Sequence, residues 1–352
     1  MTKNVYLITL FSLVLTGVYA QQWTKLSTEA YPGKQDDITF IDDQTGWYIN
    51  GYGKVYQTKN GGTTWNKLFE SKGSFFRAIA FTDSLTGYMG TVGTDYFPNV
   101  QDTIPLYKTI DGGKTWKAVA YKGPYVKGIC AIDVVKEEFI NHGKLDVKYH
   151  IYAVGRVGSP SGLIVSHDSG ATWQSYDLTS YGKMFFDIKM FDKKNGIACS
   201  ASNADISQSN ALILKTNDGG LTWKKVYQSN RPYETTWKVS FPSAKVGYVT
   251  IQSYNPDPAV TQQRIAKTTD GGETWVELDL VQDNRAREFG IGFISEQVGF
   301  VGTVTSGYQT EDGGKTWKPI NLGRACNKIR IYQDKSKTWG YAIGVDVLKL
   351  TY

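Results

Sequence analysis

The sequence predicts an all-β fold, a seven-bladed β-propeller with four-stranded blades. Three observations carry this prediction: a turn motif that recurs six times, a second turn motif that precedes it in each unit, and a last unit that lacks one strand. The composition agrees, because 37 glycines, 23 tyrosines and 10 tryptophans among 352 residues favour strands and tight turns over helices.

The first motif has the form [ST]-x-[DN]-[GS]-G-x-T-W, as in TNDGGLTW at 216–223. Its tryptophans recur at separations of 51, 57, 50, 52 and 42 residues, a period typical of propeller blades. They are Trp65, Trp116, Trp173, Trp223, Trp275 and Trp317.

The motif is a hairpin turn with a structural role. Its acid or amide can accept hydrogen bonds from nearby backbone N–H groups, and the glycines that follow permit a positive φ. A buried Trp beside the turn removes about 150–250 Å² from water. We therefore interpret the side chain at the third position as structural in every copy: Asn60, Asp111, Asp168, Asp218, Asp270 and Asp312.

The second motif, D-x-x-x-G and its variants, follows a short apolar run of period two, as in ITF before DDQTGW. This pattern indicates a strand, a turn and a second strand. A third strand, such as KVYQT at 54–58 or LILKT at 212–216, leads into the first motif, and a TWKKV-like strand follows it. Each unit thus has the four strands of a blade.

The seventh unit ends after three strands, and residues 22–26, QWTKL, resemble the missing fourth. We expect the N-terminal strand to complete the last blade, which removes an open sheet edge. Residues 21–352 then form one propeller domain. Residues 135–150 are an insertion in blade three, and we expect Glu137 and Glu138 to lie in a solvated loop there.

Residues 1–20 are predicted to be a removed signal peptide, with Lys3, an apolar run over 5–18 and a small residue, Ala20, before the cleavage site. The mature chain is expected to be exported, to the periplasm or outside the cell. No second apolar stretch is long enough to span a bilayer. The net charge of +6 is spread thinly and does not call for nucleic acid.

No cofactor or metal site is expected, because the three histidines, at 142, 150 and 167, show no metal-ligand spacing. The three cysteines are far apart in sequence. Buried free thiols are the favoured interpretation of Cys130, Cys199 and Cys326, and one disulfide pair stays open.

The first motif is the Asp-box, or BNR repeat, found in sialidases and sortilin-type receptors. Together with the second motif it resembles the photosystem II assembly and stability factor family, seven-bladed propellers with exported bacterial relatives. The resemblance covers nearly the whole mature chain, with departures at Asn60, at the insertion and in blade seven, which has no box. It implies a scaffold that holds a client protein during maturation.

The residues favour a binding protein over an enzyme, and no catalytic residue is assigned. An exported sialidase-like glycoside hydrolase is the alternative, but the family's Arg-Ile-Pro motif is absent, since the one Ile-Pro, at 104–105, follows Thr103. Paired carboxylates for hydrolysis stay open, because sequence does not place acids in space.

The candidate binding face consists of the loops that lead into the inner strands and the long loops between second and third strands. Guanidinium groups there suit an acidic protein segment or another extended acidic ligand, and exposed aromatic side chains can anchor it. The alternatives are ordinary surface arginines, and aromatic side chains that cover their own loops. The candidates are Arg77, Arg231, Arg285, Arg287 and Arg324 for the basic face, with Tyr96, Phe97 and Tyr254 as loop aromatics.

Overall fold

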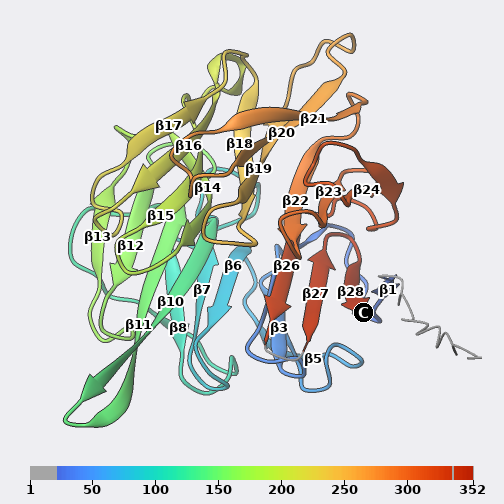
Figure 1. Ribbon diagram of the computed structural model, residues 1–352. Helices are drawn as coiled ribbons and strands as arrows, with labels where there is room; N and C mark the ends of the chain where they lie inside the picture. Colours follow the sequence, from blue (N-terminus) through green and yellow to red (C-terminus); the bar gives the residue numbers. More distant parts are fainter. Residues whose placement is uncertain (1–21, 335–336, 352) are drawn as a thin grey trace, which may run out of the picture.

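A computed structural model describes residues 22–334 and 337–351 as seven four-stranded antiparallel sheets (Figure 1). The innermost strand of each sheet contacts the innermost strand of the next, and that of the last sheet (Lys328–Gln333) contacts that of the first (Gln35–Phe40). These strands therefore surround a central axis in a closed ring, which confirms the predicted propeller. The predicted signal peptide lies outside the described residues.

Each blade is a run of consecutive strands. Blade 1 comprises β2 (Gln35–Phe40), β3 (Gly46–Asn50), β4 (Lys54–Thr58) and β5 (Asn66–Glu70). Blade 2 comprises β6 (Phe76–Phe81), β7 (Gly87–Thr91), β8 (Leu106–Thr109) and β9 (Lys117–Ala118). Blade 3 comprises β10 (Ala131–Asn141), β11 (Lys144–Gly155), β12 (Gly162–Ser166) and β13 (Gln174–Asp177).

Blades 4 to 6 repeat this order. Blade 4 comprises β14 (Met184–Met190), β15 (Gly196–Ala201), β16 (Ala211–Thr216) and β17 (Lys224–Gln228), with a short 3-10 helix, η1 (Ile206–Gln208), between β15 and β16. Blade 5 comprises β18 (Glu234–Ser240), β19 (Gly247–Ser253), β20 (Gln262–Thr268) and β21 (Val276–Gln282). Blade 6 comprises β22 (Glu288–Phe293), β23 (Gly299–Thr303), β24 (Gly307–Thr310) and β25 (Lys318–Ile320).

Blade 7 joins the two ends of the chain. It comprises β26 (Lys328–Gln333), β27 (Thr338–Ile343), β28 (Val347–Thr351) and, as its outer strand, β1 (Gln22–Lys25). β1 pairs antiparallel with β28, with Trp23 opposite Leu350. The Trp23 ring meets Phe300 of blade 6 edge-on, with centroids 5.2 Å apart. The predicted closure by the N-terminal strand is confirmed.

In the turn between the first and second strands, the apolar residue before the turn contacts the glycine after it. In blade 1, Phe40 pairs with Gly46, and a Cβ on Gly46 would lie 2.5 Å from the Phe40 ring. The same close approach joins Phe241 to Gly247 and Phe293 to Gly299. The apolar residue that ends the inner strand therefore packs over a position that only glycine fits.

The expectation of a solvated loop at 135–150 is wrong. Nearly all of these residues belong to the long strands β10 and β11. The two strands pair without interruption from Ala131 opposite Val154 to Asn141 opposite Lys144. The two connecting residues, His142 and Gly143, have φ of 48° and 77°, the left-handed pair that favours tight hairpins. The insertion is a β-hairpin that projects from the ring (Figure 1).

Candidate functional site

The Asp-box turns join the third and fourth strands of their blades. In blade 2, Asp111 Oδ1 accepts hydrogen bonds from the backbone N–H groups of Lys114 and Thr115, each at 3.0 Å, and from the Thr109 hydroxyl at 2.8 Å. The Thr115 hydroxyl donates to Oδ2 at 2.6 Å. These bonds, that of the Thr115 hydroxyl first, lower the pKa of Asp111 to about 2.

The other copies repeat this geometry at Asp168, Asp218, Asp270 and Asp312. Asn60 keeps it with an amide: its Oδ1 accepts from the Thr64 backbone N–H at 2.9 Å, while its Nδ2 donates to the Thr64 hydroxyl at 2.9 Å. Each side chain is thus engaged in its own turn.

The opposite end of the ring, where the inner strands begin, is called the loop face. It holds a pocket of about 300 Å³, the loop-face pocket, formed by the ends of inner strands and by loops between second and third strands. Its lining residues are Tyr96, Val157, Gly158, Met184, Phe186, Ala204, Ile206, Thr235, Trp237 and Tyr254. Two of the three predicted loop aromatics, Tyr96 and Tyr254, therefore line one pocket.

Two polar atoms in the pocket wall are buried without a partner. Within the described part of the chain, Trp237 Nε1 and Thr235 Oγ1 make no hydrogen bond. The Trp237 ring packs against that of Phe186, which also lines the pocket, with centroids 4.6 Å apart. A buried unpaired donor costs about 1–3 kcal/mol, so the fold leaves two polar groups beside the pocket unsatisfied.

Two of the predicted arginines lie beside this pocket. The Arg77 guanidinium lies over the Trp237 ring, 5.5 Å from its centroid, and is buried in an ion pair with Asp36, which also accepts from Lys34 Nζ at 3.1 Å. Arg287 is exposed, and its guanidinium lies 5.8 Å from the centroid of the Tyr254 ring. Burial raises the pKa of Tyr254 above its usual range, so its hydroxyl stays protonated.

The structure does not bring the remaining arginines to this pocket. Arg231 Nε lies 2.6 Å from Glu234, and its Nη2 lies 2.9 Å from Glu277 on β21, away from the axis. Arg285 is mostly exposed and bonds to Asp283 at 3.0 Å. Arg324 is exposed in the loop before β26.

Phe97 lies in a separate hollow of about 430 Å³ between blades 1 and 2. Its ring stacks on Phe75 at 4.4 Å and meets Tyr96 edge-on at 4.7 Å. Phe97 is 37% exposed and Tyr96 is 48% exposed, so both present part of their rings to solvent. The loop at 94–103 thus carries an aromatic pair that joins the two hollows.

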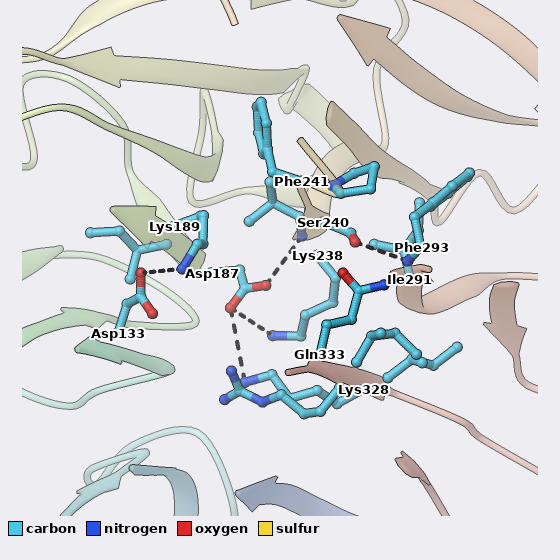
Figure 2. Close-up of a pocket in the computed structure, with 16 residues that line it drawn as sticks. Asp133, Asp187, Lys189, Lys238, Ser240, Phe241, Ile291, Phe293, Lys328 and Gln333 are labelled. Carbon is cyan, nitrogen blue, oxygen red and sulfur yellow. Dashed lines mark hydrogen bonds and ion pairs between the residues drawn. The ribbon is translucent and has the colours of Figure 1, made fainter. Parts of the chain in front are cut away.

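A charged cluster around the ring axis was not predicted from the sequence. It surrounds a cavity of about 220 Å³, the axial cavity, that is lined by residues of the inner strands of blades 3 to 7 (Figure 2). Its charged lining residues are Asp133, Asp187, Lys189, Lys238, Lys328 and Arg330. The available signal was the occurrence of charged residues inside otherwise apolar inner strands, as in TTWKVS and KIRIYQ.

Histidines at the edge of blade 3 form a small hydrogen-bonded group. His150 Nδ1 lies 3.0 Å from His167 Nδ1, and His150 Nε2 lies 2.8 Å from Glu137 Oε2. Burial, and then the neighbouring His150, lower the pKa of His167. This pairing depends on the β10–β11 hairpin and could not be predicted from the spacing of the histidines. No group of three or more metal-ligating side chains suited to a metal ion occurs in residues 22–334 and 337–351.

The described residues include no helix with the length and hydrophobicity needed to cross a bilayer. No match is found among protein-family models or among curated proteins.

Solved structures show the same fold. YCF48 from Cyanidioschyzon merolae is similar with a TM-score of 0.62 and 16% identity, over 93% of this chain and 98% of that one. YCF48 bound to D1 peptide is similar with the same TM-score and identity, over 94% and 95% of the two chains. An ancestral GH74 enzyme is similar with a TM-score of 0.62 and 15% identity, over 92% of this chain but 45% of the enzyme. The expected resemblance to photosystem II assembly factors is thus confirmed at the level of fold, and the chain is a seven-bladed propeller similar in structure to YCF48.

Proposed function

We propose that the protein is a non-catalytic binding protein that holds an extended segment of a client protein at its loop face. The observation that carries this proposal is the loop-face pocket, which has a mostly apolar and aromatic lining and the exposed Arg287 beside its Tyr254. An extended peptide can place an apolar side chain against this wall.

The charge beside the pocket favours an acidic segment. Arg287 is exposed next to Tyr254, and an exposed guanidinium can bind a carboxylate in a bidentate fashion. Arg77 is already paired with Asp36, so we assign it to the support of Trp237 rather than to direct binding. The similar structure of YCF48 with a D1 peptide supports a peptide as ligand, and assistance in client maturation is part of the proposal.

Selection from a phage-displayed peptide library against purified residues 21–352 tests this function. We expect enrichment of peptides that join an aromatic or aliphatic residue to nearby acids. Their affinity should fall about tenfold in Arg287→Ala and in Tyr96→Ala, since a charge-assisted bond or an aromatic contact is worth about 1.5 kcal/mol or more.

Arg285→Ala is the matched control, because it removes an exposed arginine two residues away that is bound to Asp283. Equal affinities of wild type, Arg287→Ala and Tyr96→Ala would contradict the proposed site. Turnover of sialosides or other glycosides that co-purifies with the protein would instead support the hydrolase alternative.

Export to the periplasm or the outside of the cell belongs to the same proposal. Expression of the full chain followed by cell fractionation and mass spectrometry should recover a mature protein that begins at Gln21. A protein that retains residues 1–20 inside the cell would contradict export.

A further inference from the structure

We propose that the axial cavity is a binding site for a small oxyanion, separate from the loop-face pocket. Four cations and two carboxylates line the cavity. A third carboxylate, Asp37, lies behind them and accepts from Lys328 Nζ at 3.1 Å and from Arg330 Nη2 at 3.2 Å. When Lys238 is protonated, the four cations therefore exceed the three carboxylates by one positive charge.

Part of this charge is paired at the cavity rim. Lys189 Nζ lies 3.4 Å from Asp133 Oδ2, and Lys189 is partly exposed. The inner part is different, because the side chains of Lys238 and Lys328 are only 5% and 6% exposed. Both ammonium groups lie 3.9 Å from the same Asp187 oxygen, too far for a good hydrogen bond (Figure 2).

Hydrogen-bond donors are left over in this inner part. An ammonium group has three N–H donors. Within the described residues, Lys238 Nζ donates to the Phe186 carbonyl at 2.9 Å and Lys328 Nζ to Asp37, and no second bond within 3.5 Å is found for either. Arg330 Nε is buried and has no partner in the same part of the chain. An oxyanion would use the remaining ammonium donors of Lys238 and Lys328 and balance the excess charge.

The size of the cavity restricts the ligand. Ligands of drug size occupy pockets of about 300–1,000 Å³, and a water molecule takes up about 30 Å³ of liquid. At about 220 Å³, the axial cavity suits an ion of a few heavy atoms, such as sulfate, phosphate or a short carboxylate. Three of its lining residues, Phe241, Pro242 and Gln333, lie at or just beyond the ends of β18 and β26 that are distant from the loop face.

The charged neighbours of Lys238 make binding sensitive to pH. Burial is the main cause that lowers the pKa of Lys238 to about 7. The charges of Lys328 and Arg77 lower this pKa further, whereas those of Asp187 and Asp37 raise it. An anion favours the charged ammonium, so its affinity should fall as pH rises through and above 7.

Thermal unfolding at constant ionic strength tests the proposal, with chloride replaced stepwise by low millimolar sulfate, phosphate or acetate. We expect a saturable rise in Tm with at least one tetrahedral or planar oxyanion at pH 6. Lys238→Met should weaken the apparent affinity about tenfold, because a bond to a charged group is lost. Asp187→Asn should strengthen it, since the competing carboxylate is removed.

Lys224→Met is the matched control, because it removes an exposed cation from the outer strand β17. Thermal unfolding curves of the wild type that coincide in chloride and in every oxyanion would overturn the proposal. So would equal responses of wild type, Lys238→Met and Asp187→Asn, since that result would reflect general salt effects. If Lys238→Met does not fold, Asp187→Asn still tests the proposal, because its affinity for the oxyanion should rise and an unchanged or lower affinity would contradict the site.

A crystal grown with selenate gives a direct test. We expect an anomalous peak within hydrogen-bond distance of Lys238 Nζ and Lys328 Nζ. Only water in the cavity, with selenate bound elsewhere or not at all, would overturn the proposal.

Discussion

At the scale of single residues, the Asp-box shows how one side chain organises a turn. The Asp111 carboxylate accepts hydrogen bonds from two backbone N–H groups and two hydroxyls at once. Asn60 Oδ1 accepts from one backbone N–H, that of Thr64, and from the Thr58 hydroxyl, and its amide donates to the Thr64 hydroxyl where a carboxylate oxygen would accept. Geometry, more than charge, is therefore the common requirement at this position.

Replacement of Asp111 tests that requirement. Asp111→Ala should lower the free energy of unfolding by about 1–2 kcal/mol, because backbone donors lose their acceptor, while Asp111→Asn should cost less than about 1 kcal/mol. Urea unfolding at pH 7 measures both. Equal losses would show that the charge matters more than the shape.

The lowered pKa of Asp111 gives a prediction about acid. A carboxylate whose pKa is lower in the folded state stabilises the fold above its unfolded pKa of about 3.9 and ceases to do so as pH falls toward the folded value of about 2. Asp111→Asn should therefore lose less stability than wild type between pH 4 and pH 2. Parallel pH profiles of the two proteins would contradict this.

At the scale of elements, β1 shows how a four-residue strand can close a ring. It pairs with β28 along its whole length and carries Trp23 against Phe300 of the neighbouring blade. Closure thus combines backbone hydrogen bonds within blade 7 with an aromatic contact to blade 6.

Trp23→Ala should lower the free energy of unfolding by about 2 kcal/mol, less than a fully buried Trp because the ring is half-buried. Thr24→Ala is the control, since Thr24 is exposed on the same strand. Chemical denaturation compares them. Identical midpoints would show that β1 contributes little to closure.

The β10–β11 hairpin should be dispensable beyond Glu137. Glu137 binds His150 and Lys193, whereas the tip is open to solvent, with Ile140 71% and Leu145 66% exposed. Replacing residues 138–147 by Asn-Gly joins Glu137 to its partner Lys148 through a favoured turn. Stability should change by less than about 1 kcal/mol. A loss above about 2 kcal/mol would reveal an unrecognised contact of the tip.

At the scale of the whole molecule, packing between blades encloses the thiols. Cys130, Cys199 and Cys326 are free and at most 1% exposed, so the disulfide alternative is not realised in the structure. Burial raises the pKa of Cys326 to about 12 and that of Cys199 well above its usual value. Thiol reagents react with the thiolate. A raised pKa keeps the thiol protonated, and burial keeps the reagent away from it.

Modification of these thiols by a bulky disulfide reagent should therefore track global unfolding. In guanidinium, the unfolded protein should react at all three cysteines. Over the same time, the native protein in buffer should show negligible reaction. A single fast thiol in the native protein would contradict the observed burial, and a mass two hydrogens lower would indicate a disulfide.

Local patterns in the sequence determined the blades. The Asp-box, the D-x-x-x-G turn and the strand that resembles TWKKV each encode a short-range interaction, so the seven sheets and the closure by residues 22–26 could be predicted. The β10–β11 hairpin could have been recognised from its alternating polarity and from the Asn141-His142-Gly143 turn, but its length was unusual for the repeat.

The tertiary structure alone decided what meets at the axis. Arg77 reaches Trp237 across the ring, and Arg287 reaches Tyr254, whereas Arg231 and Arg285 turn to nearby carboxylates. Asp37 and Lys328 are 291 residues apart and bond only because the ring closes. Repeats fix a blade through contacts between neighbours in sequence, but the residues that face one another at the axis come from distant blades, and their distances depend on how many blades there are and how each is tilted.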